Sequence, residues 1–299
     1  MMSHSQELQS ATTDELRQSE MQITEDIAGF SGPCPSCGGR EFATFQPAAF
    51  RVPIYACRNC RLHITRQPAV ADGAEPDQVY EASYHTDYEK NAEKKTRTSS
   101  YRLCVVENAI EPGRLLDIGC SVGCFLRAAV ARGWDAHGVD PSKYCVESCI
   151  THGLHARIGD MRHLDFPDES FDLINLRHVL EHDWELSDCV REMKRVLKTG
   201  GLLLVEVPSV DCWQVRLRGA RYAKFWSPAH YHYYWFSRRA LQNVMSQAGF
   251  EHVPLPLYGK MMSCGGFSDT LGFLLWRTHK LMRHWLYLSP LQVQAWHKT

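Results

Sequence analysis

Apolar and polar segments alternate regularly along the chain from residue 114 onward. Short apolar runs predict strands at 114–119, 135–140, 155–159, 171–176 and 201–207. Segments with helical periodicity lie between them, at 122–132, 142–152 and 186–198, the last closed by Gly200. A further helix is predicted over Arg238–Ala248. Because strands and helices alternate, the pattern predicts an α/β fold with a mostly parallel sheet.

The regions that flank this pattern are less regular. A helical pattern from Lys95 to Ile110 stops at Pro112-Gly113, and Glu251–Leu257 and Leu291–His297 have the character of strands, the second at a sheet edge. Residues 265–288 are interpreted as a helical insertion. Because 267–288 is apolar on most sides and carries tryptophans and basic residues, it either packs against the body or lies on a membrane surface.

Composition and charge narrow the class of protein. Hydrophobic residues make up 44% of the 299 residues, which is enough for a full core. The net charge of −1 gives no global attraction to nucleic acid or to anionic membranes. Residues 1–30 are polar and acidic, which predicts a flexible tail rather than a signal peptide, and no stretch is apolar for long enough to span a bilayer. A cytoplasmic protein is expected.

Two Cys-x-x-Cys pairs carry the strongest metal signal in the chain. They are Cys34 with Cys37 and Cys57 with Cys60, and the spacing between the pairs is that of a four-thiolate zinc site. Residues 31–66 are therefore predicted to form a zinc ribbon with a hairpin over Phe42–Tyr55. Four thiolates close the coordination shell, so the zinc is expected to be structural. The other eight cysteines are interpreted as small buried apolar residues.

A glycine-bearing turn follows the first predicted strand. Leu115–Leu126 reads as an apolar strand, a turn and the start of a helix, with Gly119 and Gly123 separated by three residues. This spacing differs from the dinucleotide fingerprint, and Asp117 just before the turn is a poor neighbour for a pyrophosphate. A carboxylate at this place suits a ligand with an ammonium or sulfonium group. Asp140, at the end of the next predicted strand, can accept hydrogen bonds from ribose hydroxyls.

Five motifs in order resemble those of the class I S-adenosylmethionine (SAM) dependent methyltransferases. They are Leu115–Gly123, Val139–Ser142, Gly159–Met161, Phe171–His182 and Leu197–Leu202. Ser121 departs from the family pattern, in which a glycine is common at this place. The resemblance covers about residues 80–299 and implies a Rossmann-like sheet with an antiparallel last strand in a methyltransferase domain over 114–299. Residues 67–113 would then form a linker and a lid helix, in which Tyr84 approaches SAM.

The resemblance also implies which residues contact the cofactor. Asp140 would hold the ribose, and Asp160 and Met161 would flank the adenine. The whole set consists of Asp117, Gly119, Cys120, Gly123, Asp140, Pro141, Asp160, Met161, Asn175 and Leu176.

Histidines are the candidates for a catalytic base, because imidazole accepts a proton near neutral pH. The candidates are His178, His182, His230 and His232, and in relatives a histidine five residues before a helix cap is frequent, which matches His232 and Ser237. The stretch from His178 to His182 also matches a zinc-peptidase pattern, but that class needs one long helix. Alternatively, Glu181 and His182 only hold the loop together.

The acceptor is less determined by the sequence than the donor. No amino-directed Asn/Asp-Pro-Pro-aromatic motif follows the fourth strand, where Asn175-Leu176-Arg177-His178 stands, so methylation of oxygen or carbon is favoured. Aromatic residues around 222–236 suit a flat or sugar-like molecule. We expect a small-molecule acceptor, such as a sugar or a polysaccharide precursor. The alternatives are an RNA methyltransferase that binds nucleic acid through Arg51, Arg58, Arg61 and Arg66 of the ribbon region, and a SAM-binding protein without catalysis.

Overall fold

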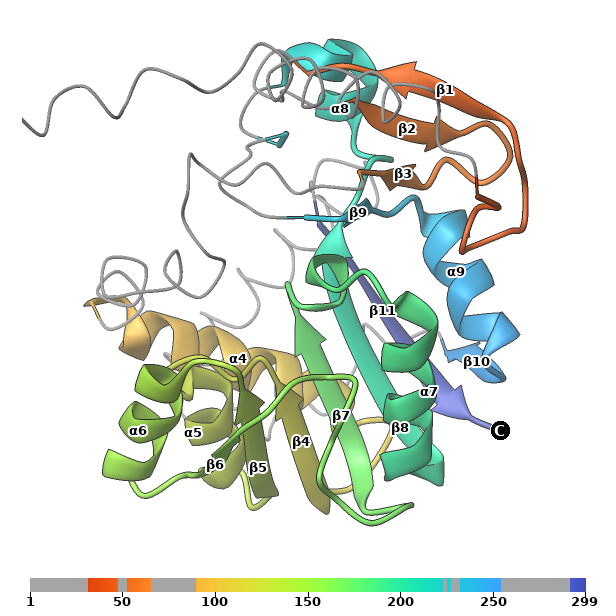
Figure 1. The fold of residues 1–299 in the computed structure, drawn as a ribbon. Coiled ribbons are helices and arrows are strands. Elements are labelled where there is room, and N and C mark those ends of the chain that lie inside the picture. The colour runs from red at the N-terminus through yellow and green to blue at the C-terminus, as the bar shows by residue number, and fades with distance from the viewer. Residues whose placement is uncertain (1–31, 48–52, 66–89, 223–224, 227–231, 254–290) are drawn as a thin grey trace, which may run out of the picture.

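The structure is a computed structural model that describes residues 32–47, 53–65, 90–222, 225–226, 232–253 and 291–299 (Figure 1). Its large sheet has seven strands in the order β10-β11-β8-β7-β4-β5-β6. These strands are β4 (Arg114–Ile118), β5 (Asp135–Asp140), β6 (His155–Ile158), β7 (Phe171–Arg177), β8 (Leu197–Pro208), β10 (Phe250–Val253) and β11 (Leu291–Lys298). β11 runs antiparallel to both of its neighbours, β8 and β10, and the other pairings of this sheet are parallel. The predicted Rossmann-like sheet with a reversed last strand is confirmed.

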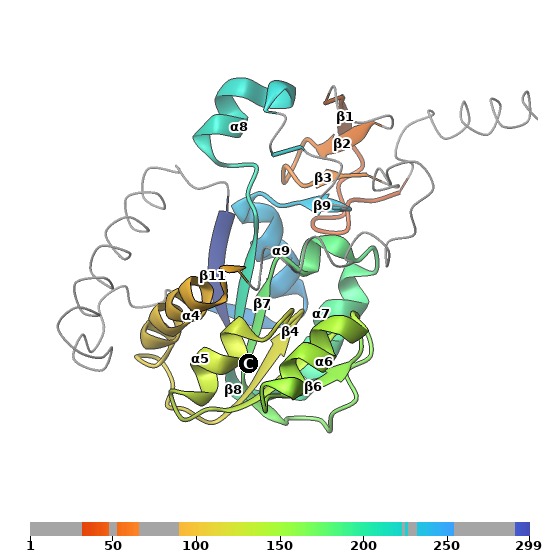
Figure 2. The ribbon, with the colours of Figure 1, turned by 90° about the vertical axis from the view of Figure 1, so that its left-hand side faces the viewer.

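Helices cover both faces of this sheet (Figures 1 and 2). The helices α4 (Ala92–Val106), α5 (Cys124–Val130) and α6 (Lys143–Thr151) cover one face, and α7 (Leu186–Val196) and α9 (Arg238–Gln247) cover the other. Successive strand residues point to opposite faces of the sheet. Leu115 therefore packs in the layer of α4 and α5, and Leu116 packs in the layer of α7 and α9. Both faces are therefore apolar, and the ligand-binding groups gather where the strands end.

One sequence-based prediction about this sheet was wrong, and one predicted helix ends two residues earlier than expected. Residues 291–297 were expected at the edge, but β11 is inserted between β8 and β10, and β10 forms the edge. The helix predicted over 186–198 ends at Val196, because Leu197 is fully buried and pairs with Phe171 of β7. Strand pairing thus outweighs the glycine signal at residue 200.

A second, smaller sheet joins the N-terminal region to the segment just before α9. It has the order β1-β2-β3-β9, in which β1 (Phe42–Phe45), β2 (Ile54–Cys57) and β3 (His63–Ile64) come from the N-terminal region. The fourth strand, β9 (Tyr234–Trp235), lies just before α9. We call residues 34–65 the cysteine ribbon. Together with α8 (Trp213–Arg218) it lies above the carboxyl-terminal edge of the large sheet (Figures 1 and 2).

Hydrogen bonds attach the cysteine ribbon to the start of α9. The Ser237 hydroxyl donates to the Cys60 carbonyl at 2.5 Å and accepts from the Ala240 amide at 2.9 Å, so that it also caps the helix. The Ser36 hydroxyl donates to the Ala240 carbonyl at 3.0 Å, and the Gln247 amide donates to the Ser36 carbonyl at 2.8 Å. The apolar core is likewise continuous, since Leu62 and Ile64 pack in one cluster with α7 and α9.

Several expectations from the sequence lie outside the described residues. They concern the tail over 1–30, the position of Tyr84, His230, and the insertion at 265–288 with its alternative contact to a membrane surface. Among the residues that the structure does describe, no helix combines the length and the apolar character needed to cross a bilayer.

Replacing Ser237 by alanine should destabilise the protein by about 1–3 kcal/mol, because one buried hydroxyl both caps α9 and satisfies the Cys60 carbonyl. The free energy of unfolding, measured by urea denaturation, tests this. Thr151→Ala is the matched control, since the Thr151 hydroxyl is exposed and donates only within its own helix. Equal losses in the two variants would contradict the role given to Ser237.

Candidate active site

The turn after β4 has the backbone geometry of a ligand-binding loop. Gly119 and Gly123 have φ angles of 71° and 77°, in the region that favours glycine. A Cβ atom on Gly119 would collide with the Val179 side chain, and one on Gly123 would lie 2.9 Å from the Cys149 sulfur. Residues with side chains are therefore excluded at both positions. The contact with Val179 also places the loop after β7 directly against this turn.

A buried carboxylate lies at the base of the turn. Asp117 is 4% exposed, and the Asn175 amide on β7 donates to its Oδ1 at 2.6 Å. Burial raises the pKa of the Asp117 carboxyl to about 7, although the Asn175 hydrogen bond acts in the opposite direction. A ligand ammonium group next to Asp117 would favour the charged carboxylate.

The other predicted cofactor residues lie at the ends of β5, β6 and β7. The Asp140 carboxylate accepts from the Ser121 amide at 2.8 Å and from the Ser142 amide at 2.9 Å, which fixes its orientation beside the turn. Asp160 is half-exposed and accepts from the Arg162 amide at 2.7 Å. The remaining members are placed as follows: Met161, Cys120, Asn175 and Leu176 are buried, and Pro141 is exposed.

These residues fit SAM by their chemistry. The two glycines allow a ligand to approach the backbone closely, and a positive ligand group would stabilise the charged form of the desolvated Asp117 carboxyl. Within the described part of the chain, the buried Ser121 Oγ and Asn175 Oδ1 have no hydrogen-bond partner. Buried polar atoms are usually satisfied, so these two are free to accept or donate toward a bound ligand.

Three histidines surround a buried glutamate beside the turn. The residues after β7 include His178, which adopts a left-handed φ of 56°, and the short 3₁₀ turn η1 (Leu180–His182). Glu181 is fully buried, and its Oε1 lies 3.3 Å from His178 Nδ1 and 3.8 Å from His232 Nε2. The His182 and His232 rings meet edge to face with centroids 4.8 Å apart. The fold thus brings His178, His182 and His232 together.

This cluster is held in place by two backbone contacts. The His178 amide donates to the Glu206 carbonyl of β8 at 2.9 Å. The Tyr233 amide donates to the Glu181 carbonyl at 2.9 Å, which brings the segment before β9 beside η1. Because His178 is outside any helix and η1 is only one short turn, the peptidase arrangement of this sequence is not formed.

A second buried carboxylate, which the sequence interpretation missed, supports the cluster. Glu206 is 1% exposed, and it pairs with Arg102 of α4 at 3.3 Å and with Arg177 at 3.1 Å. His178 Nε2 lies 3.7 Å from the same carboxylate. Arg102 is itself buried, and desolvation lowers its pKa. The signal in the sequence was one glutamate within the apolar run from Leu202 to Val207.

The aromatic segment before α9 packs differently from the expectation. Trp226, Trp235 and Phe236 are fully buried, and Trp226 and Trp235 form a cluster with Ile54 of the ribbon. They join the cysteine ribbon to the body and leave no face for an acceptor. Tyr233 remains half-buried beside Trp184, with ring centroids 5.8 Å apart.

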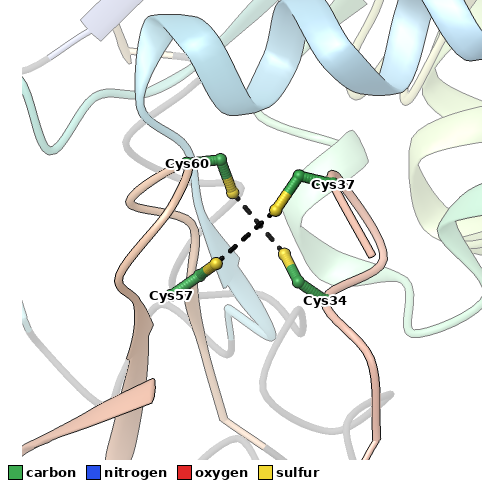
Figure 3. Close-up of side chains that lie close together, drawn as sticks. All are labelled: Cys34, Cys37, Cys57 and Cys60. Carbon is green, nitrogen blue, oxygen red and sulfur yellow. Dashed lines mark hydrogen bonds between the residues drawn. The ribbon is translucent and has the colours of Figure 1, made fainter. Parts of the chain in front are cut away.

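The four ribbon cysteines converge on one point (Figure 3). Cys34 Sγ lies 3.5 Å from Cys60 Sγ, and Cys37 Sγ lies 3.6 Å from Cys57 Sγ. All four sulfurs lie within 4.8 Å of one another. Tetrahedral zinc–thiolate bonds of about 2.3 Å separate neighbouring sulfurs by about 3.8 Å, so the four positions suit one ion.

The comparisons with known proteins agree with this fold and site. A family model described as "Methyltransferase domain" matches residues 85–255. The chain is 30% identical over 137 residues to a ubiquinone biosynthesis O-methyltransferase of Bradyrhizobium sp. (strain ORS 278). The aligned region covers 42% of this chain and 52% of the relative. The chain is also 34% identical over 116 residues to 24-methylenesterol C-methyltransferase 2 of Oryza sativa subsp. japonica. Here the aligned region covers 36% of this chain and 32% of the relative.

A solved structure shows the same fold. It is the Haloferax volcanii complex between the Trm112 methyltransferase activator and a candidate methyltransferase, with a TM-score of 0.51 and 15% identity, covering 77% of this chain and 99% of that one. The fold and the turn define a SAM-dependent methyltransferase. With more than half of its residues matched by the model, the chain belongs to the methyltransferase domain family. The chain covers only about half of the length of the first relative and a third of the second. Their methyl acceptors are therefore not assigned to this chain.

The raised pKa of Asp117 predicts a pH dependence of stability in the ligand-free protein. In the unfolded chain this carboxyl loses its proton near pH 4, whereas in the folded protein it keeps it up to about pH 7. The folded state therefore binds more protons in this window, and the free energy of unfolding should fall as pH rises from 4 to 7. In Asp117→Asn this decline should be smaller, as urea denaturation at several pH values would show. Identical pH profiles for the two proteins would contradict the assignment.

Proposed function

We propose that this enzyme transfers the methyl group of SAM to a hydroxyl group of a small molecule, such as a sugar or a polysaccharide precursor. The observation that carries the proposal is the cluster of His178, His182 and His232 around Glu181, next to the cofactor turn. Hydroxyl oxygen is a poor nucleophile unless its proton is removed, and imidazole is suited to accept that proton. The alternative for the same site is an acceptor that is methylated on carbon. Such an acceptor would lose its proton to the base after methylation.

Different residues of the chain would bind the methyl donor, SAM, and the acceptor. Bound SAM supplies an electrophilic methyl group on a sulfonium sulfur. Asp117 would hold the ammonium group, Asp140 the ribose hydroxyls, and Asp160 and Met161 the adenine. The Ser121 and Ser142 amides orient the Asp140 carboxylate beside the turn for this role.

The acceptor proton would pass to a histidine of the cluster. His232 was the preferred base from the sequence, but it is 7% exposed, whereas the side chain of His178 is 33% exposed. Glu181 Oε1 at 3.3 Å from Nδ1 orients the His178 ring, and its Nε2 lies 3.7 Å from Glu206 Oε1. We therefore assign the proton transfer to His178, with His182 and His232 shaping the site around Glu181.

A small molecule is preferred over RNA as the acceptor. Among the described residues of the ribbon, Arg61 is paired with Asp211 at 2.8 Å, which removes one of the four arginines considered for nucleic acid. Arg51 and Arg66 lie outside the described residues. The half-exposed Tyr233 and Trp184 beside the histidines supply ring faces for a sugar-like molecule.

We further propose that the cysteine ribbon binds one structural zinc ion. Cys34, Cys37, Cys57 and Cys60 supply four thiolates, which leave no open position for a substrate. The ion would connect the two turns of the ribbon, whose strand β3 pairs with β9, and β9 begins two residues after His232. The zinc therefore supports the position of the active-site segment without taking part in the reaction.

Replacing His178 by alanine should lower kcat by a factor of about 10² to 10⁴, with little change in the affinity for SAM. The measurement is the release of S-adenosylhomocysteine with a panel of hydroxylated acceptors, with the product identified by mass spectrometry. His152→Ala, on the exposed end of α6, is the control. An unchanged kcat in His178→Ala would remove the proposed base, and methylation of RNA alone would overturn the proposed acceptor class.

Replacing Cys37 by serine should remove one equivalent of thiolate-bound zinc and lower Tm by about 5 °C or more, because structural zinc contributes directly to folding. Titration with a mercurial reagent that releases zinc from thiolates counts this ion. Cys145→Ser on α6 controls for the loss of a cysteine, and it should keep the zinc. A wild-type chain without releasable zinc would contradict the ribbon assignment.

A further inference from the structure

Glu181 is a buried carboxylate without an Arg or Lys partner among the described residues. It is 0% exposed, and its Oε2 has no hydrogen-bond partner in the part of the chain that the structure describes. Among the described residues, the groups that pair with its Oε1 are imidazole nitrogens, of His178 and His232. Burying a carboxylate is costly unless a cation compensates it. Two arginines do so at the neighbouring Glu206, whereas no arginine or lysine in the described part of the chain does so at Glu181.

We propose that Glu181, His182 and His232 bind a divalent transition-metal ion. One ligand atom from each lies within 4.8 Å of the others, the same limit within which the four ribbon sulfurs lie. Two imidazoles and one carboxylate form a donor set that suits zinc, iron or cobalt. The unsatisfied Glu181 Oε2 is the second, independent sign of a ligand at this place.

The three ligands are held by the fold before a metal arrives. Glu181 and His182 belong to η1, and His232 is brought there by the bond from the Tyr233 amide to the Glu181 carbonyl. The Tyr234 hydroxyl also donates to the Trp184 carbonyl at 2.8 Å, which ties β9 to the residues just after η1. A site built from positions locked in this way loses little entropy on binding an ion.

Three protein ligands leave coordination positions open for an oxygen of the acceptor. An ion there would lower the pKa of the acceptor hydroxyl. The O–H bond would then break with the proton passing to His178, the oxygen pair would form the new C–O bond, and the C–S electron pair would stay on sulfur as S-adenosylhomocysteine. This role rests on the proposed function, whereas the binding of the ion does not.

Cobalt(II) binding to the full chain tests the site without any turnover. The chain is first loaded with one equivalent of zinc, which the four thiolates of the ribbon take up, and Co²⁺ binding is then measured by equilibrium dialysis and absorption spectroscopy. We expect one equivalent of Co²⁺ without thiolate charge-transfer bands, because the ligands are nitrogen and oxygen. Glu181→Gln and His182→Asn should each weaken Co²⁺ binding about tenfold or more, in line with the loss of one ligand. His152→Asn, far from the cluster, should bind as the wild type does.

The releasable zinc of the ribbon shows whether each variant is folded, and the two variants replace different ligands, so a folding defect in one leaves the other informative. Absence of Co²⁺ binding to the wild type, or wild-type binding by a folded Glu181→Gln, overturns the metal site. Bands of thiolate–cobalt charge transfer also overturn it, since the ion would then be in the ribbon.

Measurements of methylation test the role of the metal in the reaction separately from its binding. Loss of methylation in a chain dialysed free of the second ion, restored by Co²⁺ or Zn²⁺ in the wild type and not in Glu181→Gln, supports the role in the reaction. Methylation that proceeds unchanged without the ion overturns that role. If Co²⁺ binds at the cluster while no hydroxylated acceptor is methylated, the site is supported and the proposed acceptor class fails.

Discussion

Carboxylates buried at one edge of the parallel sheet are the constraint on which the rest of this site depends. Asp117, Asp140, Glu181 and Glu206 each have less than a tenth of their surface exposed, and each needs a partner. Asp140 accepts backbone amides, and Glu206 has two arginines. Asp117 has one amide and a raised pKa, and the partners of Glu181 in the described part of the chain are imidazoles. The two carboxylates that the protein itself compensates least therefore mark the places where it would hold a cationic ligand.

The donor half of the site was predictable, because its signals are local in sequence. The turn from Asp117 to Gly123, the acid at Asp140 and the Cys-x-x-Cys pairs each lie within a few residues, and the parallel fold brings the strand ends together. The acceptor half was predictable only in part. His178 and His182 share one loop, but the distance of His232 from them depends on β9, a two-residue strand that gives no periodic signal.

The remaining errors of prediction have a common physical cause. The position of β11 inside the sheet, the early end of α7 and the burial of Trp226 and Trp235 are all decided by contacts between residues far apart in sequence. Local patterns describe what a segment can form, whereas these features depend on what lies beside it. The same holds for Arg102, whose partner Glu206 lies on a different element.

The attachment of the cysteine ribbon to α9 also has a consequence for how the chain folds during synthesis. Ser36 bonds to Ala240, 204 residues later, and Ser237 bonds to Cys60 across 177 residues. The ribbon therefore leaves the ribosome long before its partner strand exists, with one edge of β3 unpaired. Contacts of this length make folding slow. A metal-bound ribbon would keep β1, β2 and β3 paired with one another during this interval, ready to receive β9.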